Sequence, residues 1–231
     1  MRNPRRTKVL AGISAFCACL VFATGERAAF AGDVPEKSLT LQELIDLPEK
    51  DLARVDIATL NLACAEGLPG SEKIDRAAIL ETIDSWARQV AAVTASKAHF
   101  FESHPDYYEN SWAKYCSIML VLTLQQDLGV HYNIEQRTKP SLAKSKDQFI
   151  HGIVEGTGGT CASLPVIFVA VGRRLGYPLR LAQSFSHFYA RWDDPVTGEQ
   201  FNVDGSNSTA QSYSPNTSGF DRGRCRVVTV L

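Results

Sequence analysis

Cys161, His187 and Asp204 are residues whose types and order suit nucleophilic catalysis. A cysteine thiolate attacks acyl carbons, an imidazole takes the thiol proton, and a carboxylate fixes the tautomer of the imidazole and stabilises its charged form. We expect these three roles to fall on the three residues in that order. Simpler interpretations stay open, because Cys161 also fits a buried helix, and His187 and Asp204 also fit a solvated sheet face.

An apolar run follows Cys161 and ends at Arg173 and Arg174, which predicts a buried helix with the cysteine in its first turn. Thr160 or Gly159 is the expected N-terminal cap, and Pro165 removes one early hydrogen bond. Unpaired backbone amides at the start of a helix favour the thiolate and lower the pKa of a thiol placed there. The same amides are suited to hold a developing oxyanion.

Two short amphipathic segments, 186–192 and 199–204, predict a β-hairpin joined by residues 193–198. Pairing the last residue of the first strand with the first residue of the second sets His187 opposite Asp204. A slip of one residue would undo this pairing. Alternation along both strands also predicts one polar face and one buried face, the buried face holding Phe188, Ala190, Trp192, Phe201 and Val203.

Helices are predicted for most of residues 38–129. Thr40 followed by Glu43 is a capping-box pattern, a short helix is expected from Ile57 to Glu66, and a helix of about twenty residues is expected from near Asp75. The apolar positions of that longer helix recur every three or four residues: Ile79, Leu80, Ile83, Trp86, Ala87 and Val90.

The rest of the chain alternates between short elements and loops. A single further helix is expected from Pro105 to Gly129, then a loop over 130–144 and a short helix over 144–155. Residues 205–223 predict a surface loop, and residues 225–231 a final strand.

The first 31 residues predict a signal peptide, because four basic residues precede an uncharged run from Val9 to Ala23 and small residues follow at 29–31. An uncleaved N-terminal anchor is the alternative. Cleavage would place the protein outside the cell or in the periplasm, with no membrane attachment. It would also leave 19 basic and 24 acidic side chains, a net charge of −5. This charge argues against nucleic acid as a partner.

Cysteine and histidine spacing gives no metal site, so we expect neither a metal nor another cofactor. The cysteines after the leader are far apart, and His99, His104, His131 and His151 are scattered. In an oxidising compartment Cys64 and Cys116 are the pair most worth testing for a disulfide, with buried free thiols as the alternative.

Three polar residues upstream of Cys161 are candidates for lining a cleft or for donating to an oxyanion: Tyr132, Asn133 and Gln148. The competing interpretation is that they are ordinary loop or helix residues.

Four short segments together resemble the bacterial transglutaminase-like superfamily: 158–165 (GGTCASLP), 173–179 (RRLGYPL), 186–188 (SHF) and 201–204 (FNVD). The resemblance covers roughly residues 145–207. It implies an α+β fold with a cysteine-bearing helix packed on an antiparallel sheet, and a papain-like triad whose nucleophile, base and carboxylate fall on Cys161, His187 and Asp204. Residues 61–70 also resemble the N-terminal part of such bacterial proteins, and name no chemistry.

We therefore expect a signal peptide over 1–31, a helical region over 32–143 and a catalytic core over 144–231. The expected activity is hydrolysis of a peptide or amide bond in a protein or peptide substrate through a thioester acyl-enzyme, because water is the default acceptor. The alternative is a non-catalytic binding or scaffold domain of the same fold.

Overall fold

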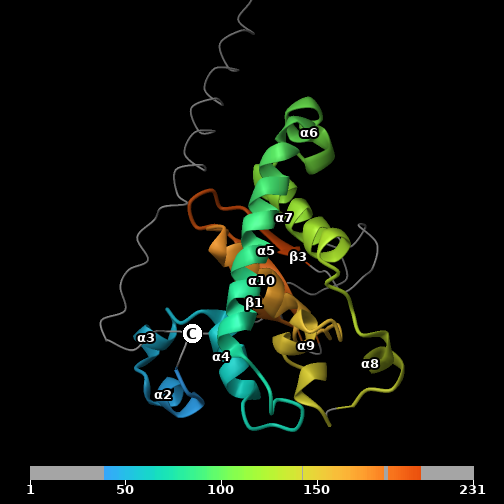
Figure 1. Ribbon diagram of the computed structural model, residues 1–231. Helices are drawn as coiled ribbons and strands as arrows, with labels where there is room; N and C mark the ends of the chain where they lie inside the picture. Colours follow the sequence, from blue (N-terminus) through green and yellow to red (C-terminus); the bar gives the residue numbers. More distant parts are fainter. Residues whose placement is uncertain (1–38, 142, 185–186, 204–231) are drawn as a thin grey trace, which may run out of the picture. The chain divides into compact units, whose positions relative to one another are not determined.

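A computed structural model describes residues 39–141, 143–184 and 187–203 of this chain of 231 residues. A series of helices comes first and a small antiparallel sheet follows (Figure 1). This is an α+β arrangement, as the sequence predicts. The predicted signal peptide, Asp204, the loop over 205–223 and the strand over 225–231 lie outside the described residues.

Short helical elements make up most of the first part of the described chain. They are α2 (Leu41–Asp46), α3 (Glu49–Leu52), α4 (Ile57–Ala65), α5 (Arg76–Ser96), α6 (Ala98–Ser103), the 3-10 helix η4 (Pro105–Tyr108), α7 (Trp112–Leu122), the π-helical turn η5 (Thr123–Asp127) and α8 (Ile134–Thr138). The later elements are the 3-10 helix η6 (Ser145–Asp147), α9 (Ile150–Val154), α10 (Leu164–Arg174), β1 (Leu179–Gln183), β2 (Phe188–Asp193) and β3 (Gln200–Val203).

The predicted helix starts are confirmed where a capping residue marks them. The hydroxyl oxygen of Thr40 accepts from the Glu43 amide, and the Glu43 carboxylate accepts from the Thr40 amide, which completes the capping box of α2. Asp75 caps α5 through the Ala78 amide at 3.0 Å. The predicted core face of α5 is buried, with Trp86 half-buried at its edge: Ile79, Leu80, Ile83, Ala87 and Val90.

The prediction of a single helix from Pro105 to Gly129 is wrong, because the helical conformation is interrupted after η4. Glu109 and Asn110 take left-handed backbone angles, with φ of 54° and 58°, which no helix contains. Ser111 then starts α7 as a new helix by accepting from the Lys114 amide.

The loop predicted over 130–144 contains α8, whose first turn is capped by the side chain of Asn133. The helix predicted over 144–155 is shorter and divided, with η6 and α9 separated by Gln148 and Phe149. Gly152 explains how closely these two pieces pack, since a Cβ at Gly152 would lie 1.7 Å from the carbonyl oxygen of Lys146. A side chain at this position would force α9 away from η6.

α10 lies between the long helix α5 and the sheet (Figure 1), and packs on β1 and β2. Its residues 164–172 are buried in one core that α4, α5 and α7 also enter. The sheet has the order β1-β2-β3, and β1 is a strand that the sequence pattern did not predict. The predicted alternation is confirmed on β3, where Phe201 and Val203 are buried. On β2 it holds only in part, because Ala190 and Trp192 are buried, but Phe188 is half-buried and Tyr189 of the predicted polar face is buried too.

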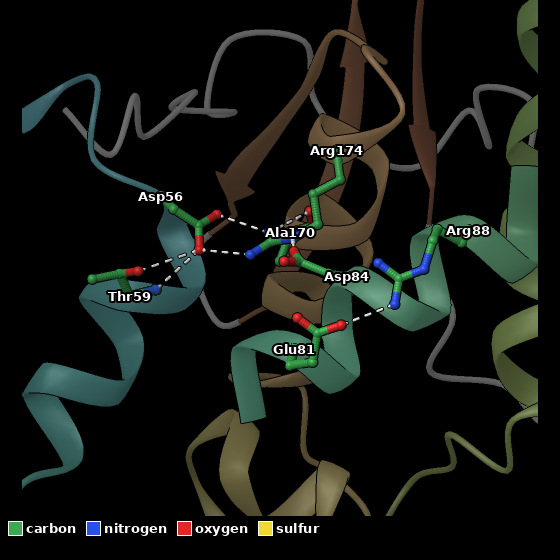
Figure 2. Close-up of polar contacts among 7 residues, drawn as sticks. All are labelled: Asp56, Thr59, Glu81, Asp84, Arg88, Ala170 and Arg174. Carbon is green, nitrogen blue, oxygen red and sulfur yellow. Dashed lines mark hydrogen bonds and ion pairs between the residues drawn. The ribbon is translucent and has the colours of Figure 1, made fainter. Parts of the chain in front are cut away.

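An ion-pair cluster fixes the C-terminal end of α10 against two other helices (Figure 2). Arg174 donates from its Nη1 and Nη2 atoms to the carboxylate of Asp56, at 2.9 and 3.1 Å, and from its Nε atom to Asp84 at 2.5 Å. Asp56 also caps α4 by accepting from the Thr59 amide at 3.2 Å. One guanidinium therefore joins the start of α4, the first half of α5 and the end of α10.

A second polar contact ties the β2–β3 connection to α7. The hydroxyl of Ser111 donates to the Glu199 carboxylate at 2.5 Å, while the same oxygen caps α7. Lys114, one turn further along α7, lies 6.0 Å from the ring centre of Phe201 on β3. The far end of the hairpin is thus fixed to a helix of the N-terminal part.

Candidate active site

Cys161 lies in a turn that leads directly into α10, and not within the helix as predicted. The helix begins at Leu164, because Pro165 has no amide hydrogen to donate to the Cys161 carbonyl. The turn is nevertheless closed by Thr160, whose carbonyl accepts from the amides of Ser163 and Leu164 at 3.2 and 3.0 Å. The cysteine therefore precedes α10 in a helix-like turn, and its thiol is free and half-buried.

The predicted cap, Thr160 or Gly159, is wrong for α10, whose N-cap is Ser163 without a side-chain capping bond. Thr160 instead closes the preceding turn, and it uses its side chain as well. Its Oγ1 atom accepts from the Ala162 amide at 3.2 Å, and its own amide donates to the Ser163 hydroxyl at 3.0 Å. Thr160 and Ser163 are both buried, so this reciprocal pair is shielded from water. The amides of Ala162, Ser163 and Leu164 are thereby occupied, which contradicts the expectation that they hold an oxyanion.

The segment 131–133 lies beside the cysteine loop and is joined to it by backbone hydrogen bonds. Gly159 donates to the His131 carbonyl at 2.9 Å and accepts from the Asn133 amide at 2.7 Å, which sets Tyr132 opposite Gly159 in a parallel bridge. Gly158 allows this close approach, since a Cβ there would lie 2.9 Å from the His131 ring and 3.1 Å from the Asn133 amide nitrogen. These hydrogen bonds hold the backbone of Tyr132 next to the turn that contains Cys161.

Replacing Gly158 by alanine is expected to destabilise the protein more than replacing Gly156. Both glycines have φ of +85°, so both substitutions carry the same strain of a left-handed residue, about 1–2 kcal/mol. Only at Gly158 does the new methyl group meet a neighbour. We expect a further loss of about 1–3 kcal/mol from this overlap, measured by urea denaturation. Equal losses in the two variants would show that the bridge yields without cost.

His187 comes immediately before β2, at the hairpin end of the β1–β2 pair. Its carbonyl accepts from the Ser184 amide at 2.8 Å, so the antiparallel hydrogen bonding of β1 and β2 extends to Ser184 and His187. Its imidazole lies along the ring of Tyr189, with ring centres 6.3 Å apart. Tyr189, on β2, is buried on the strand face opposite that of Ala190 and Trp192.

Chain connectivity brings the end of the hairpin near the start of α10. The link from α10 to β1 has only four residues, and a Cβ at Gly172 near the end of α10 would meet Leu179 at the start of β1. β1 therefore runs back along the helix. Eleven helical residues and five strand residues both span about 16 Å. The hairpin end that carries His187 consequently lies toward the end of α10 that Cys161 precedes.

The strand register differs by two residues from the one predicted. Arg191 pairs with Asn202 and Ala190 with Val203, whereas the prediction sets Tyr189 opposite Asn202. A shift of two residues preserves which side chains share a face, so the predicted faces hold although the pairs do not. The expectation that His187 lies directly opposite Asp204 depended on the wrong register. Asp204 itself lies outside the described residues.

Of the three polar candidates upstream, two have their side chains engaged elsewhere. The Asn133 side-chain oxygen accepts from the Glu135 amide at 3.1 Å, and the Gln148 amide group donates to the Ser141 carbonyl at 3.2 Å. Tyr132 is half-buried against the core. Burial raises the pKa of its hydroxyl, and the neighbouring Cys161 raises it further. The structure therefore brings Tyr132, of the three, to the cysteine.

The other cysteines and histidines have separate environments. Cys64 is exposed and Cys116 is buried, and no disulfide joins them, so the structure does not contain the candidate disulfide. His151 is fully buried with its Nε2 atom 3.2 Å from the Ser145 hydroxyl, and burial lowers its pKa. Within the described ranges, no group of three or more His, Cys, Asp or Glu side chains is placed to hold a metal ion.

None of the helices in the described part of the chain has the length and apolar character needed to cross a membrane. Comparison with known proteins found no matching family model, no matching curated protein and no matching solved structure.

Proposed function

We propose that this chain is an exported, cysteine-dependent acyl-transfer enzyme of transglutaminase-like type that hydrolyses a peptide or amide bond. One observation carries the proposal: the half-buried free thiol of Cys161 lies in the turn that leads into α10, toward the sheet end at which His187 immediately precedes β2. A thiol and an imidazole at one end of a helix–sheet unit suit nucleophilic catalysis.

In the proposed reaction the Cys161 thiolate attacks the acyl carbon of the substrate. His187 holds the thiol proton and gives it to the leaving amine, which leaves a thioester on Cys161. Water then attacks the thioester, with His187 taking one of its protons and returning it to the sulfur. Asp204 is proposed to orient the imidazole and to stabilise its charged form.

The pH dependence of iodoacetamide alkylation tests whether the thiol and the imidazole form a pair. We expect Cys161 to be alkylated selectively at pH values at which an ordinary thiol is almost entirely protonated and reacts slowly, because a nearby imidazolium would favour the thiolate. Peptide mass spectrometry would follow the site of reaction.

Cys64 is a built-in control for this experiment, because it is an exposed free thiol whose pKa is raised by desolvation. In a His187→Ala variant the profile of Cys161 should move up toward that of an ordinary thiol, while the profile of Cys64 stays unchanged. If Cys161 behaves as an ordinary thiol in both proteins, the catalytic proposal fails, and a binding role for the fold becomes the better hypothesis.

A further inference from the structure

The turn that holds Cys161 has few amides left for a developing negative charge. Three of its amides donate to Thr160, through the Thr160 carbonyl or hydroxyl oxygen. Among the described residues, the Cys161 amide has no such acceptor. Attack on a carbonyl places a full charge on its oxygen, and one donor is a weak oxyanion site where two or more are usual. A side-chain donor is needed to complete it.

Tyr132 lies beside the turn that holds Cys161. Two backbone hydrogen bonds hold it in register with Gly159, two residues before the thiol, and the absence of a side chain at Gly158 permits that contact. Its ring packs on the core, so the phenol has little freedom to move. Because burial and the nearby Cys161 both raise its pKa, the hydroxyl keeps its proton at neutral pH and is available as a donor.

We propose that the Tyr132 hydroxyl donates a hydrogen bond to the oxyanion that forms when Cys161 attacks an acyl carbon. In that step the sulfur–carbon bond forms and the carbonyl π electrons move onto the oxygen, where the Cys161 amide and the Tyr132 hydroxyl bind them. The C=O bond then re-forms and the leaving group departs. This inference rests on the proposed function, since it requires that Cys161 attack acyl groups.

Two reagents separate the oxyanion role from the reactivity of the thiol. Iodoacetamide alkylates the thiolate by displacement and forms no oxyanion, whereas p-nitrophenyl acetate acylates it through a tetrahedral oxyanion. In Tyr132→Phe the ring and its packing are kept. We expect acylation of Cys161 to slow by about 100-fold, as for loss of one oxyanion donor, while alkylation of Cys161 and its pH profile stay within twofold.

Tyr107→Phe is the matched control, because Tyr107 is an exposed tyrosine on η4 and should leave both rates unchanged. Modification at Cys161 would be read by mass spectrometry after digestion in acid, where thioesters survive. Unchanged acylation in Tyr132→Phe overturns the oxyanion role alone. An equal loss of alkylation and acylation also overturns it, because Tyr132 would then act on the thiol or its loop. A wild-type protein that is alkylated at Cys161 but never acylated overturns both proposals.

Discussion

Arg174→Met is expected to lower the free energy of unfolding by about 3–5 kcal/mol. The guanidinium is only 10% exposed, and its partners Asp56 and Asp84 are 21% and 22% exposed. Removing it takes from both carboxylates the guanidinium that they share, while both stay largely out of water. Such uncompensated charges cost more than the ion pair itself contributes, because the desolvation penalty persists.

Figure 2 also shows the matched control for this substitution, the pair between Arg88 and Glu81 on α5. Its side chains are 65% and 63% exposed, so water screens them and the pair contributes less than about 1 kcal/mol. Urea denaturation of Arg174→Met and Arg88→Met should therefore give clearly different losses. Thermal denaturation should show a fall of about 10 °C for Arg174→Met alone. Similar small losses in both variants would mean that α4, α5 and α10 hold together without this cluster.

Local signals account for the elements that the sequence predicts well. Asp75 caps α5 and Thr40 caps α2, and the apolar spacing of α5 needs no distant partner to be recognised. Local signals do not predict the interruption at Glu109 and Asn110. Neither residue is a glycine, and each takes a positive φ only in its tertiary context. Aromatic packing surrounds that break, with Phe101 against Trp112 at 5.2 Å and Tyr108 against Tyr115 at 5.1 Å.

Register is the part of the sheet that alternation leaves undetermined. A period of two fixes which residues share a face, so the buried positions of β3 are predictable, while Tyr189 on β2 is buried although it lies on the predicted polar face. It does not distinguish pairings that differ by two residues, since both keep the same faces. The turn between the strands selects one pairing. In this turn the Asp194 carboxylate accepts hydrogen bonds from the Thr197 hydroxyl and from the Val196 amide.

Long-range contacts are beyond any local pattern, and they include those most relevant to the candidate site. The bridge between Tyr132 and Gly159 joins segments that the sequence separates by α8, η6 and α9, and the paired glycines before Cys161 are its one local sign. Arg174 illustrates the same limit. Its place at a helix C-terminus predicts a favourable dipole interaction, but not two carboxylates from other helices.

Asp204→Asn is expected to reduce turnover by about 10⁴-fold under the proposed mechanism. An asparagine has the shape of the aspartate but presents an NH₂ group or a neutral oxygen to the imidazole. It therefore fails to stabilise the charged imidazole, and it favours the tautomer that leaves no base toward the thiol. The measurement is steady-state hydrolysis of p-nitrophenyl acetate, with the fold checked by circular dichroism.

Asp194→Asn is the control for this variant, since Asp194 is a half-buried carboxylate in the turn between β2 and β3, on the strand connection and not beside the imidazole. It should keep activity, and any loss there would report on the turn and not on the imidazole. The alkylation profile of Cys161 gives a second readout, because loss of the carboxylate should also weaken the thiolate–imidazolium pair and move the profile up. Unchanged turnover in Asp204→Asn would assign the orienting role to another group. The strand register would explain such a result. Asp204 was placed opposite His187 on the predicted register, and the observed register differs from it by two residues.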